Sequence, residues 1–282
     1  AARPRRRIAV IGAGAIGLTT ALTLQRAGAE VTIHARERPA DTRSSRATGT
    51  WSPDSRIADS AATGPDFAAR WETMARRTWA GHLALAGEPG DPVAFTDRWV
   101  VTGSGAVPQP PSPLPGIAFF HGDRLRDIVP AFRAMPTGRH PFGNRPVRHG
   151  VSMQFNIHLL QRLLTADFLR EGGRILPADF RTPADLLALP EAVIVNCTGY
   201  GARALWADTS IIPVRGQLAW LPAQPEAPYG LYYRGVSSLS RPDGLILQFV
   251  GNDDMLGVGD ENEAPDRAEA LAAIKTLGEI FA

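Results

Sequence analysis

The sequence predicts an α/β protein in which a parallel sheet flanked by helices is combined with a separate antiparallel sheet. Residues 7–22 read as an apolar strand, a glycine-rich turn and a helix in direct succession. Residues 31–33 then supply a second apolar strand, as in a parallel strand–helix–strand unit. Three later apolar segments have the length and spacing of an antiparallel sheet, namely residues 216–221, 231–234 and 244–250.

The turn after the first strand has the spacing Gly12-x-Gly14-x-x-Gly17. Between a strand and a helix, glycines at these positions allow a sharp turn, close approach of the backbone to a pyrophosphate, and tight packing of the helix on the strand. The start of the helix then points at the phosphate charge. Leu18 and Leu22 follow with helical spacing, which favours this Rossmann-like, dinucleotide-binding interpretation over a glycine-rich turn without a ligand.

The second strand ends differently from the usual pattern. An acidic residue normally follows this strand and binds a ribose hydroxyl. Here the chain reads His34-Ala35-Arg36-Glu37, so the acid is displaced. From Glu37 to Asp59 hydrophobic periodicity is lost and Ser, Thr, Arg and Pro accumulate, which predicts a long loop. Long loops in compact domains are usually functional.

The remaining elements alternate between helices and strands. We expect a helix at residues 67–86, a second marked by leucines at 159, 160, 163 and 164 that ends near Gly172, and a third from Pro265 onward. Strands are expected at 98–102, 174–176 and 192–195. The apolar strand at 192–195 is typical of a buried parallel sheet and returns the chain to the first module. We therefore predict two discontinuous modules, the first formed by residues 1–54 and 150–210, the second by residues 55–149 and 211–282.

Composition excludes several classes of protein. The 282 residues carry a formal charge of +2 that is spread thinly, which argues against a nucleic-acid-binding surface. One cysteine, Cys197, excludes an internal disulfide framework, and the histidines show no ligand spacing, so we expect no metal site. No run of 18 apolar residues predicts a membrane span. We expect a cytoplasmic protein, with export by way of a signal removed upstream of Ala1 left open.

Several motifs occur in the order found in one family. They are the glycine turn, the His34–Glu37 segment, the loop from Asp41 to Trp51, the Asn196-Cys197-Thr198-Gly199 segment and Arg215-Gly216-Gln217. In these motifs the sequence resembles the D-amino-acid oxidase family of flavoproteins. The resemblance implies a Rossmann-like FAD-binding parallel sheet, formed by the first module, with an antiparallel β-sheet substrate or cap domain formed by the second.

The resemblance also implies which residues bind FAD. The turn would contact the pyrophosphate and the end of the second strand would border the adenosine ribose. The serine-rich loop would contact phosphate and then run beside the isoalloxazine ring, and Phe180 would lie near the adenine. The implied FAD-binding residues are Gly12, Ala13, Gly14, Ala15, Ile16, Gly17, Ala35, Arg36, Glu37, Thr42, Arg43, Ser44, Ser45, Ala47, Thr48, Gly49, Thr50, Trp51, Phe180, Thr198 and Gly199.

The chain departs from the family in two places. The family binds the substrate carboxylate with an arginine in a late Gly-x-Arg-Pro-x-Arg segment, which this sequence does not contain, and Gln248-Phe249 stands where the family usually has two glycines. The available substitutes are Tyr232, Tyr233, Arg234 and Arg241. Strand alternation predicts that Tyr232 and Arg234 share a face, whereas Arg241 lies on the predicted sheet beside a turn at the rim. We therefore expect Arg234 to bind the carboxylate.

The expected activity is FAD-dependent oxidation of an amino acid, with a D-amino acid favoured. The product would be an imino acid that hydrolyses to a keto acid, with O2 reduced to H2O2. Two alternatives stay open: a non-catalytic or fragmentary flavin-binding relative, and an NAD-dependent dehydrogenase. The expected partners are an amino-acid substrate and O2, without nucleic acid or membrane, and a homo-oligomer is left open.

Overall fold

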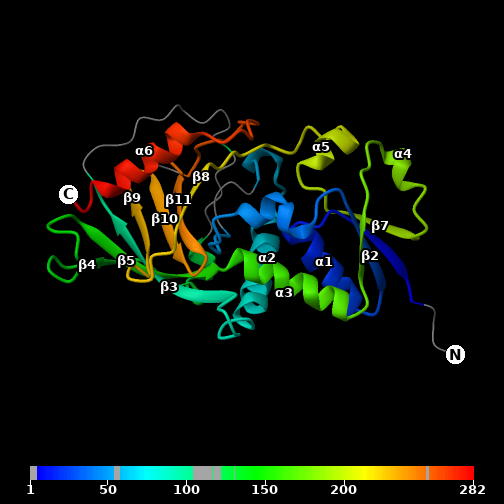
Figure 1. The fold of residues 1–282 in the computed structure, drawn as a ribbon, viewed down its shortest axis with the longest axis horizontal. Helices are drawn as coiled ribbons and strands as arrows, with labels where there is room; N and C mark the ends of the chain where they lie inside the picture. Colours follow the sequence, from blue (N-terminus) through cyan, green and yellow to red (C-terminus); the bar gives the residue numbers. More distant parts are fainter. Residues whose placement is uncertain (1–4, 54–57, 104–115, 117–121, 130, 252–253) are drawn as a thin grey trace. The chain divides into compact units, whose positions relative to one another are not determined.

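The computed structural model describes residues 5–53, 58–103, 116, 122–129, 131–251 and 254–282, and Figure 1 shows their fold. The chain forms two compact units. The first contains residues 1–47 and 157–212, and the second contains residues 48–156 and 213–282. The boundary predicted at residue 54 lies outside the described residues. Within the described part of the chain, no helix is long and apolar enough to cross a membrane.

The first unit contains a four-stranded parallel sheet. Its strands are β1 (Arg7–Ile11), β2 (Glu30–Ala35), β6 (Arg174–Pro177) and β7 (Val193–Asn196), in the order β6-β2-β1-β7. Ile11 lies opposite His34 on one side and Asn196 on the other, so the carboxyl ends of these strands lie at one edge of the sheet. The predicted parallel sheet is confirmed.

Helices cover both faces of this sheet. Helices α1 (Ala15–Arg26) and α3 (Ile157–Arg170) bury Leu18, Leu22 and Phe168 against one face. The shorter helices α4 (Pro183–Leu186) and α5 (Gly201–Trp206) bury Leu186 and Leu205 against the other. The loop after β2 contains the short 3-10 helices Pro39–Asp41 and Arg43–Arg46.

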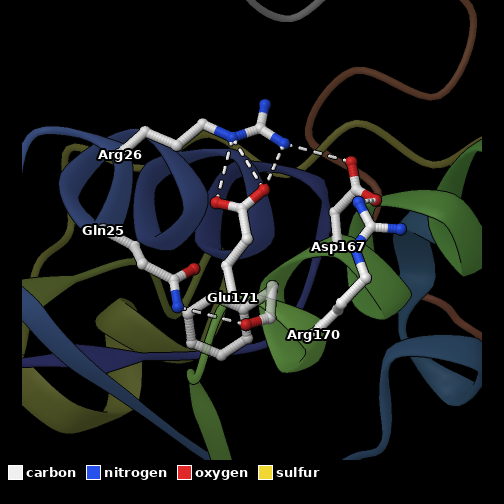
Figure 2. A network of polar contacts seen from close by, with 6 residues as sticks. Gln25, Arg26, Asp167, Arg170 and Glu171 are labelled. Atoms are coloured by element: carbon white, nitrogen blue, oxygen red, sulfur yellow. Dashed lines mark hydrogen bonds and ion pairs between the residues drawn. The ribbon is translucent and has the colours of Figure 1, made fainter.

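A network of polar side chains joins the ends of α1 and α3, as Figure 2 shows. Arg26 donates from Nη2 to Glu171 Oε1 at 2.7 Å and to Asp167 Oδ2 at 3.1 Å. Arg170 donates to the second oxygen of Asp167 at 2.7 Å, and Gln25 Nε2 donates to the Phe168 carbonyl at 3.2 Å. These hydrogen bonds raise the pKa of Arg26 and lower the pKa of Glu171.

The second unit contains a seven-stranded sheet in the order β4-β5-β3-β9-β10-β11-β8. The strands are β3 (Val93–Val101), β4 (Arg133–Met135), β5 (Val147–Phe155), β8 (Leu218–Leu221), β9 (Gly230–Tyr233), β10 (Val236–Arg241) and β11 (Gly244–Phe249). Strands β3 and β9 run parallel and the other neighbours run antiparallel, so the prediction of an antiparallel sheet is corrected to a mixed one. Strand β3 lies between β5 and β9 in the sheet. It thereby connects the early strands β4 and β5 with the later group of β8, β9, β10 and β11.

The two faces of the mixed sheet differ in chemistry. Helix α6 (Arg267–Gly278) packs on one face, where Val101, Leu231, Tyr233 and Leu247 form an apolar core (Figure 1). Strand alternation and register place polar side chains on the opposite face. We call this the polar face, and its residues include Thr96, Arg98, Gln154, Tyr232, Ser237, Arg241 and Gln248.

The second unit also contains helix α2 (Phe67–Leu83) and the short 3-10 helices Ser60–Ala62 and Gly122–Leu125. Trp71 and Ala75 of α2 form a small core with Leu125, against which Trp51 packs. The segment that contains Trp51 is tied to β5, because Trp51 donates its backbone N–H to the Met153 carbonyl and Phe155 donates to the Gly49 carbonyl. Residues 48–51 therefore belong to the second unit, which corrects their predicted place in the first module.

Candidate functional site

The first unit contains a cavity of about 410 Å³, which lies within the range of about 300–1,000 Å³ typical of small-molecule sites. Five segments and Leu205 line it, and all lie at or beyond the carboxyl ends of the four parallel strands. The lining residues are Ile11 to Ile16, His34 to Glu37, Thr42 to Ser44, Ala178 to Phe180, Asn196 to Gly201, and Leu205.

The cavity lies where ligands bind in open α/β sheets. The chain continues from β1 toward β2 on one side, whereas β7 joins the sheet on the other, so the strand order reverses beside β1. Two backbone hydrogen bonds hold the adjoining strand ends together. Gly12 donates to the His34 carbonyl at 2.8 Å, and Cys197 donates to the Ile11 carbonyl at 2.9 Å.

The glycines of the turn are required by geometry. Gly12 has φ +108°, and a Cβ there would lie 2.4 Å from the Cys197 carbonyl oxygen. A Cβ on Gly17 would lie 2.0 Å from the Gly12 carbonyl oxygen, so this glycine permits the close packing of α1 on the turn. These contacts match the roles expected for the first and third glycines of a dinucleotide-binding turn.

The start of α1 opens onto the cavity and suits an anion. Gly14 caps the helix without a side-chain hydrogen bond, and the first turn contains no acidic residue. The backbone N–H of Ala15 donates to Ser44 Oγ at 3.0 Å. Since unpaired N–H groups and the helix dipole favour negative charge, the residues present fit a pyrophosphate.

The loop that carries Arg43 and Ser44 is anchored on both sides. Gln161 of α3 donates from Nε2 to the Pro39 carbonyl and to Thr42 Oγ1, and Ser45 Oγ donates to the Thr42 carbonyl at 2.7 Å. Arg43 lies over the ring of Tyr200, with its guanidinium carbon 5.5 Å from the ring centroid. The loop after β2 and the segment after β7 thus meet across the cavity through a cation–π contact.

Charged and aromatic side chains line the far end of the cavity. Arg36 donates to Glu37 at 2.9 Å, so the displaced acid lies at the cavity wall beside an arginine. His34 and Phe180 approach edge to face, with ring centroids 6.1 Å apart. Behind them His34 Nε2 lies 3.7 Å from Glu191 Oε2, and both atoms are buried without a hydrogen bond.

Cys197 also lines the cavity but lacks the environment of a nucleophile. Burial raises the pKa of its thiol, although a hydrogen bond with Thr20 opposes the shift. A raised pKa disfavours the reactive thiolate at neutral pH. Its contact with the core beneath α1 is consistent with the expected packing role. Within the described ranges, no group of three His, Cys, Asp or Glu side chains could hold a metal ion.

The structure brings most of the predicted residues of the first unit together. The predicted residues that line the cavity are Gly12, Ala13, Gly14, Ala15, Ile16, Ala35, Arg36, Glu37, Thr42, Arg43, Ser44, Phe180, Thr198 and Gly199. Gly17 and Ser45 support the walls from behind, and Ala47 does not line the cavity. The lining residues that sequence reasoning missed are Ile11, His34, Ala178, Asp179, Asn196, Cys197, Tyr200, Gly201 and Leu205. The sequence does carry a signal for most of them, because all except Leu205, which lies in α5, are at the end of a parallel strand or follow one closely.

The predicted substrate residues lie in the second unit. Tyr232 lies on the polar face and donates its hydroxyl to the Gly251 carbonyl at 3.0 Å. Tyr233 lies on the opposite face in the core beneath α6, as alternation predicts. Tyr233 therefore contributes to packing on that side of the sheet.

Arg234 differs from its prediction, because β9 ends at Tyr233. Arg234 and Gly235 have φ +45° and +76°, which is the pattern of a two-residue type I′ hairpin turn between β9 and β10. Alternation does not extend through a turn, so the expectation that Arg234 shares a face with Tyr232 is wrong. Arg234 instead forms an ion pair with Glu279 at 2.7 Å.

Arg241 lies on the sheet beside the predicted turn, and it is buried. It is the last residue of β10, and its side chain is fully buried. It donates two hydrogen bonds of 2.8 Å to Asp243 and a third, of 2.9 Å, to the Thr48 carbonyl. Thr48 in turn donates its hydroxyl to Gln248 at 2.7 Å. The hairpin of β10 and β11 thus holds the segment that the resemblance places beside the flavin ring.

Comparison with known proteins agrees with this arrangement. A family described as FAD dependent oxidoreductase matches residues 7–281. A D-amino-acid oxidase from Streptomyces coelicolor is 32% identical over 212 residues, which are 75% of this chain and 58% of that protein. A D-amino-acid oxidase from Rubrobacter xylanophilus is 28% identical over 276 residues, covering 95% of this chain and 75% of that protein.

Solved structures share the fold. Glycine oxidase from Geobacillus kaustophilus superposes with a TM-score of 0.64 at 13% identity, covering 97% of this chain and 78% of that one. Iminodiacetate oxidase from Chelativorans sp. BNC1 gives a TM-score of 0.62 at 18% identity, covering 97% and 77%. With the strand–turn–helix cavity and the family match over nearly the whole chain, these comparisons show that the chain belongs to the D-amino-acid oxidase family of FAD-dependent oxidoreductases.

Proposed function

We propose that this protein binds FAD and oxidises an amino acid at its Cα–N bond, with a D-amino acid as the favoured substrate. The observation that carries the proposal is the cavity at the carboxyl ends of β1, β2, β6 and β7, in a chain related to D-amino-acid oxidases. The chain's match spans only 58% of the length of the Streptomyces relative. The proposed activity therefore rests on the chemistry of the residues that line the cavity as well as on sequence similarity.

The residues of the first unit suit the nucleotide half of FAD. The glycine turn and the first turn of α1 would bind the pyrophosphate through backbone N–H groups, and Arg43 would add a guanidinium cation. Glu37 is an acceptor of the kind that binds ribose hydroxyls. The edge-to-face pair of His34 and Phe180 offers aromatic walls to an adenine ring.

When bound, FAD supplies an acceptor for the hydride from the substrate Cα and a route for two electrons to O2. The overall reaction converts an amino acid, O2 and water into a keto acid, ammonia and H2O2. The protein would orient the substrate, bind its carboxylate and hold the Thr48–Trp51 segment in position. Orientation is a large part of such catalysis, because misplacement of a reacting group by about 1 Å can cost about 100-fold in rate.

The test is a substrate screen with product analysis. Protein loaded with FAD should consume O2 with one or more D-amino acids and form keto acid and H2O2 in equal amounts. The screen includes L-amino acids, glycine and sarcosine, which separate a D-amino-acid oxidase from an enzyme of different specificity. Bound FAD without any turnover would indicate a non-catalytic flavin-binding relative, and turnover only with added NAD would indicate a dehydrogenase.

A further inference from the structure

A side-chain contact joins two sides of the cavity in the first unit. Arg43 lies in the loop after β2 and Tyr200 follows β7, and both residues line the cavity. The guanidinium carbon of Arg43 lies 5.5 Å from the centroid of the Tyr200 ring. Three other arginines lie over aromatic rings in the described part of the chain, and none of those contacts involves a residue that lines the cavity.

Burial places this contact on the solvent side of the cavity. Ile11 and Ala13, which line the cavity at the end of β1, are only 4% and 2% exposed. In contrast, Arg43 is exposed and Tyr200 is half-buried. The two side chains therefore meet where the cavity opens to solvent, which we call the mouth of the cavity.

Each side of the mouth is anchored to its own part of the unit. On one side, Gln161 of α3 donates to the hydroxyl of Thr42, the residue before Arg43, at 3.2 Å. On the other side, Asn196 Oδ1 accepts hydrogen bonds from the backbone N–H and the hydroxyl of Thr198, at 3.2 and 2.8 Å. Since the two sides are held separately, the contact between them can open while both anchors stay in place.

The backbone around Tyr200 can accommodate a movement of that residue. Gly199 and Gly201 flank it, and glycine has the greatest backbone freedom of all residues. Gly199 has φ +55°, and a Cβ built there would meet no atom within 4 Å. Hinge positions are often small residues at the ends of elements, as these two glycines are at the start of α5.

The contact is compatible with a bound phosphate. A guanidinium places its flat face on an aromatic ring and donates hydrogen bonds to phosphate from its edge. Arg43 can therefore lie over Tyr200 and also make the phosphate contact that is proposed for it. For this reason the same contact can exist in the free protein and in the FAD-loaded protein.

We propose that Arg43 and Tyr200 form a clasp across the mouth of the cavity, which opens when FAD enters or leaves. This inference rests on the FAD binding in the proposed function. A contact that is equal in the free and loaded protein does not change the equilibrium, but it breaks whenever FAD passes. The clasp therefore slows uptake and release by the same factor. The usual strength of a cation–π contact corresponds to a factor of about 2 to 30.

The test measures FAD uptake and release separately, without turnover. Uptake by protein stripped of FAD, and release from loaded protein after dilution, are each followed by the change in flavin fluorescence. Tyr200→Leu should raise both rate constants by about 2- to 30-fold and keep the dissociation constant within about 2-fold of the wild-type value. Tyr200→Phe keeps the ring and should restore the wild-type rate constants.

A second variant changes the other partner of the clasp and keeps its charge. Arg43→Lys retains a cation but loses the planar guanidinium, so the uptake rate constant should rise by less than in Tyr200→Leu. In a protein that already carries Tyr200→Leu, adding Arg43→Lys should not raise the uptake rate constant further, because the contact is already lost. Thermal unfolding shows whether each variant is folded, and Arg43→Lys tests the clasp if Tyr200→Leu does not fold.

Controls separate the clasp from general effects of substitution. Tyr229→Leu removes a half-buried tyrosine of the second unit, and Arg46→Lys changes an exposed arginine of the same loop. Neither residue lines the cavity, so both variants should take up and release FAD like the wild type. The clasp is overturned if Tyr200→Leu raises the release rate constant alone, if it changes neither rate constant, or if a folded Arg43→Lys protein takes up FAD at the wild-type rate.

The same measurements distinguish this inference from the proposed function. If amino acids are oxidised but Tyr200→Leu exchanges FAD at the wild-type rate, the clasp fails and the function stands. If both rate constants respond as expected but no amino acid is oxidised, the clasp stands and the proposed oxidation fails. If the wild-type protein does not bind FAD, both fail.

Discussion

At the scale of single residues, the cavity depends on positions where the backbone leaves no room for a side chain. Gly12 has φ +108° and faces the Cys197 carbonyl, so a Cβ there would clash with it. Gly28 also has positive φ (+95°), but a Cβ at this position would meet no atom within 4 Å. Gly12 is therefore required by both conformation and space, whereas Gly28, which follows α1, is required by conformation alone.

This difference predicts distinct effects of two alanine substitutions. Gly12→Ala should destabilise the first unit by about 1–3 kcal/mol, the usual cost of overpacking, and should lower FAD content because the turn must shift. Gly28→Ala should cost about 1–2 kcal/mol from left-handed backbone strain and leave FAD binding intact. Urea unfolding and FAD titration check both. Equal FAD affinity in the two variants would contradict the role of the turn.

Arg241 is a second residue with a definite role in the structure. Its fully buried guanidinium holds Asp243 and the Thr48 carbonyl and lies over the Trp220 ring, with 4.7 Å to the centroid. Arg241→Met should therefore destabilise the protein by about 3 kcal/mol, as when one partner of a buried ion pair is removed. Arg241→Lys keeps the charge and should cost less. If Arg241→Met and the wild type unfold at the same urea concentration, this network contributes little to the stability of the protein.

At the scale of elements, strand alternation is reliable inside strands and fails at their ends. It places Tyr232 and Tyr233 on opposite faces, as observed. It fails for Arg234, because the turn that begins there depends on positive φ at Arg234 and Gly235, and a Tyr-Arg-Gly sequence carries a weaker hairpin signal than Asn-Gly. Arg241 follows the expected pattern, because it ends β10 and the predicted turn after it leads into β11.

The pairing of α1 and α3 predicts a pH-dependent contribution to stability. Arg26 holds the pKa of Glu171 below its ordinary value of 4.5, chiefly through hydrogen bonds. A group with a lowered folded-state pKa stabilises the protein above that ordinary value, and the contribution is lost as pH falls through the folded-state pKa. Arg26→Gln should therefore lower the urea midpoint at pH 7, and the difference from wild type should shrink below pH 4.5.

The matched control for this prediction is Arg162→Gln, which removes an exposed arginine from α3. It should change the urea midpoint little at either pH. A difference between Arg26→Gln and wild type that stays constant from pH 7 to below pH 4.5 would assign the effect to packing of the arginine side chain instead of its charge.

At the scale of the whole molecule, local sequence patterns predict the first unit better than the second. The parallel sheet, its glycine turn and most of the cavity wall follow from segments that are contiguous in sequence. The second unit depends on long-range pairs, such as β3 with β9 and the segment of residues 48–51 with β5, which no local periodicity reveals. For this reason the sequence predicts the antiparallel sheet without its parallel pair.

The domain boundaries also depend on contacts between segments that are far apart in the sequence. The sequence predicts modules that change at residues 54, 150 and 210, whereas the compact units change after residues 47, 156 and 212. Backbone hydrogen bonds that join Gly49 and Trp51 to β5 draw the end of the serine-rich loop into the second unit. Composition alone does not signal such bonds, because Thr, Gly and Trp at these positions read as ordinary loop residues.

The central claim, that this protein oxidises amino acids with FAD, is tested most directly by anaerobic mixing of the FAD-loaded protein with amino acids. Without O2, a productive substrate should reduce the bound flavin and bleach its visible absorbance in a single turnover. Deuterium at the substrate Cα should slow the bleaching, because the Cα–H bond breaks in that step. Flavin that stays oxidised with every D-amino acid, L-amino acid, glycine and sarcosine tested would contradict the account.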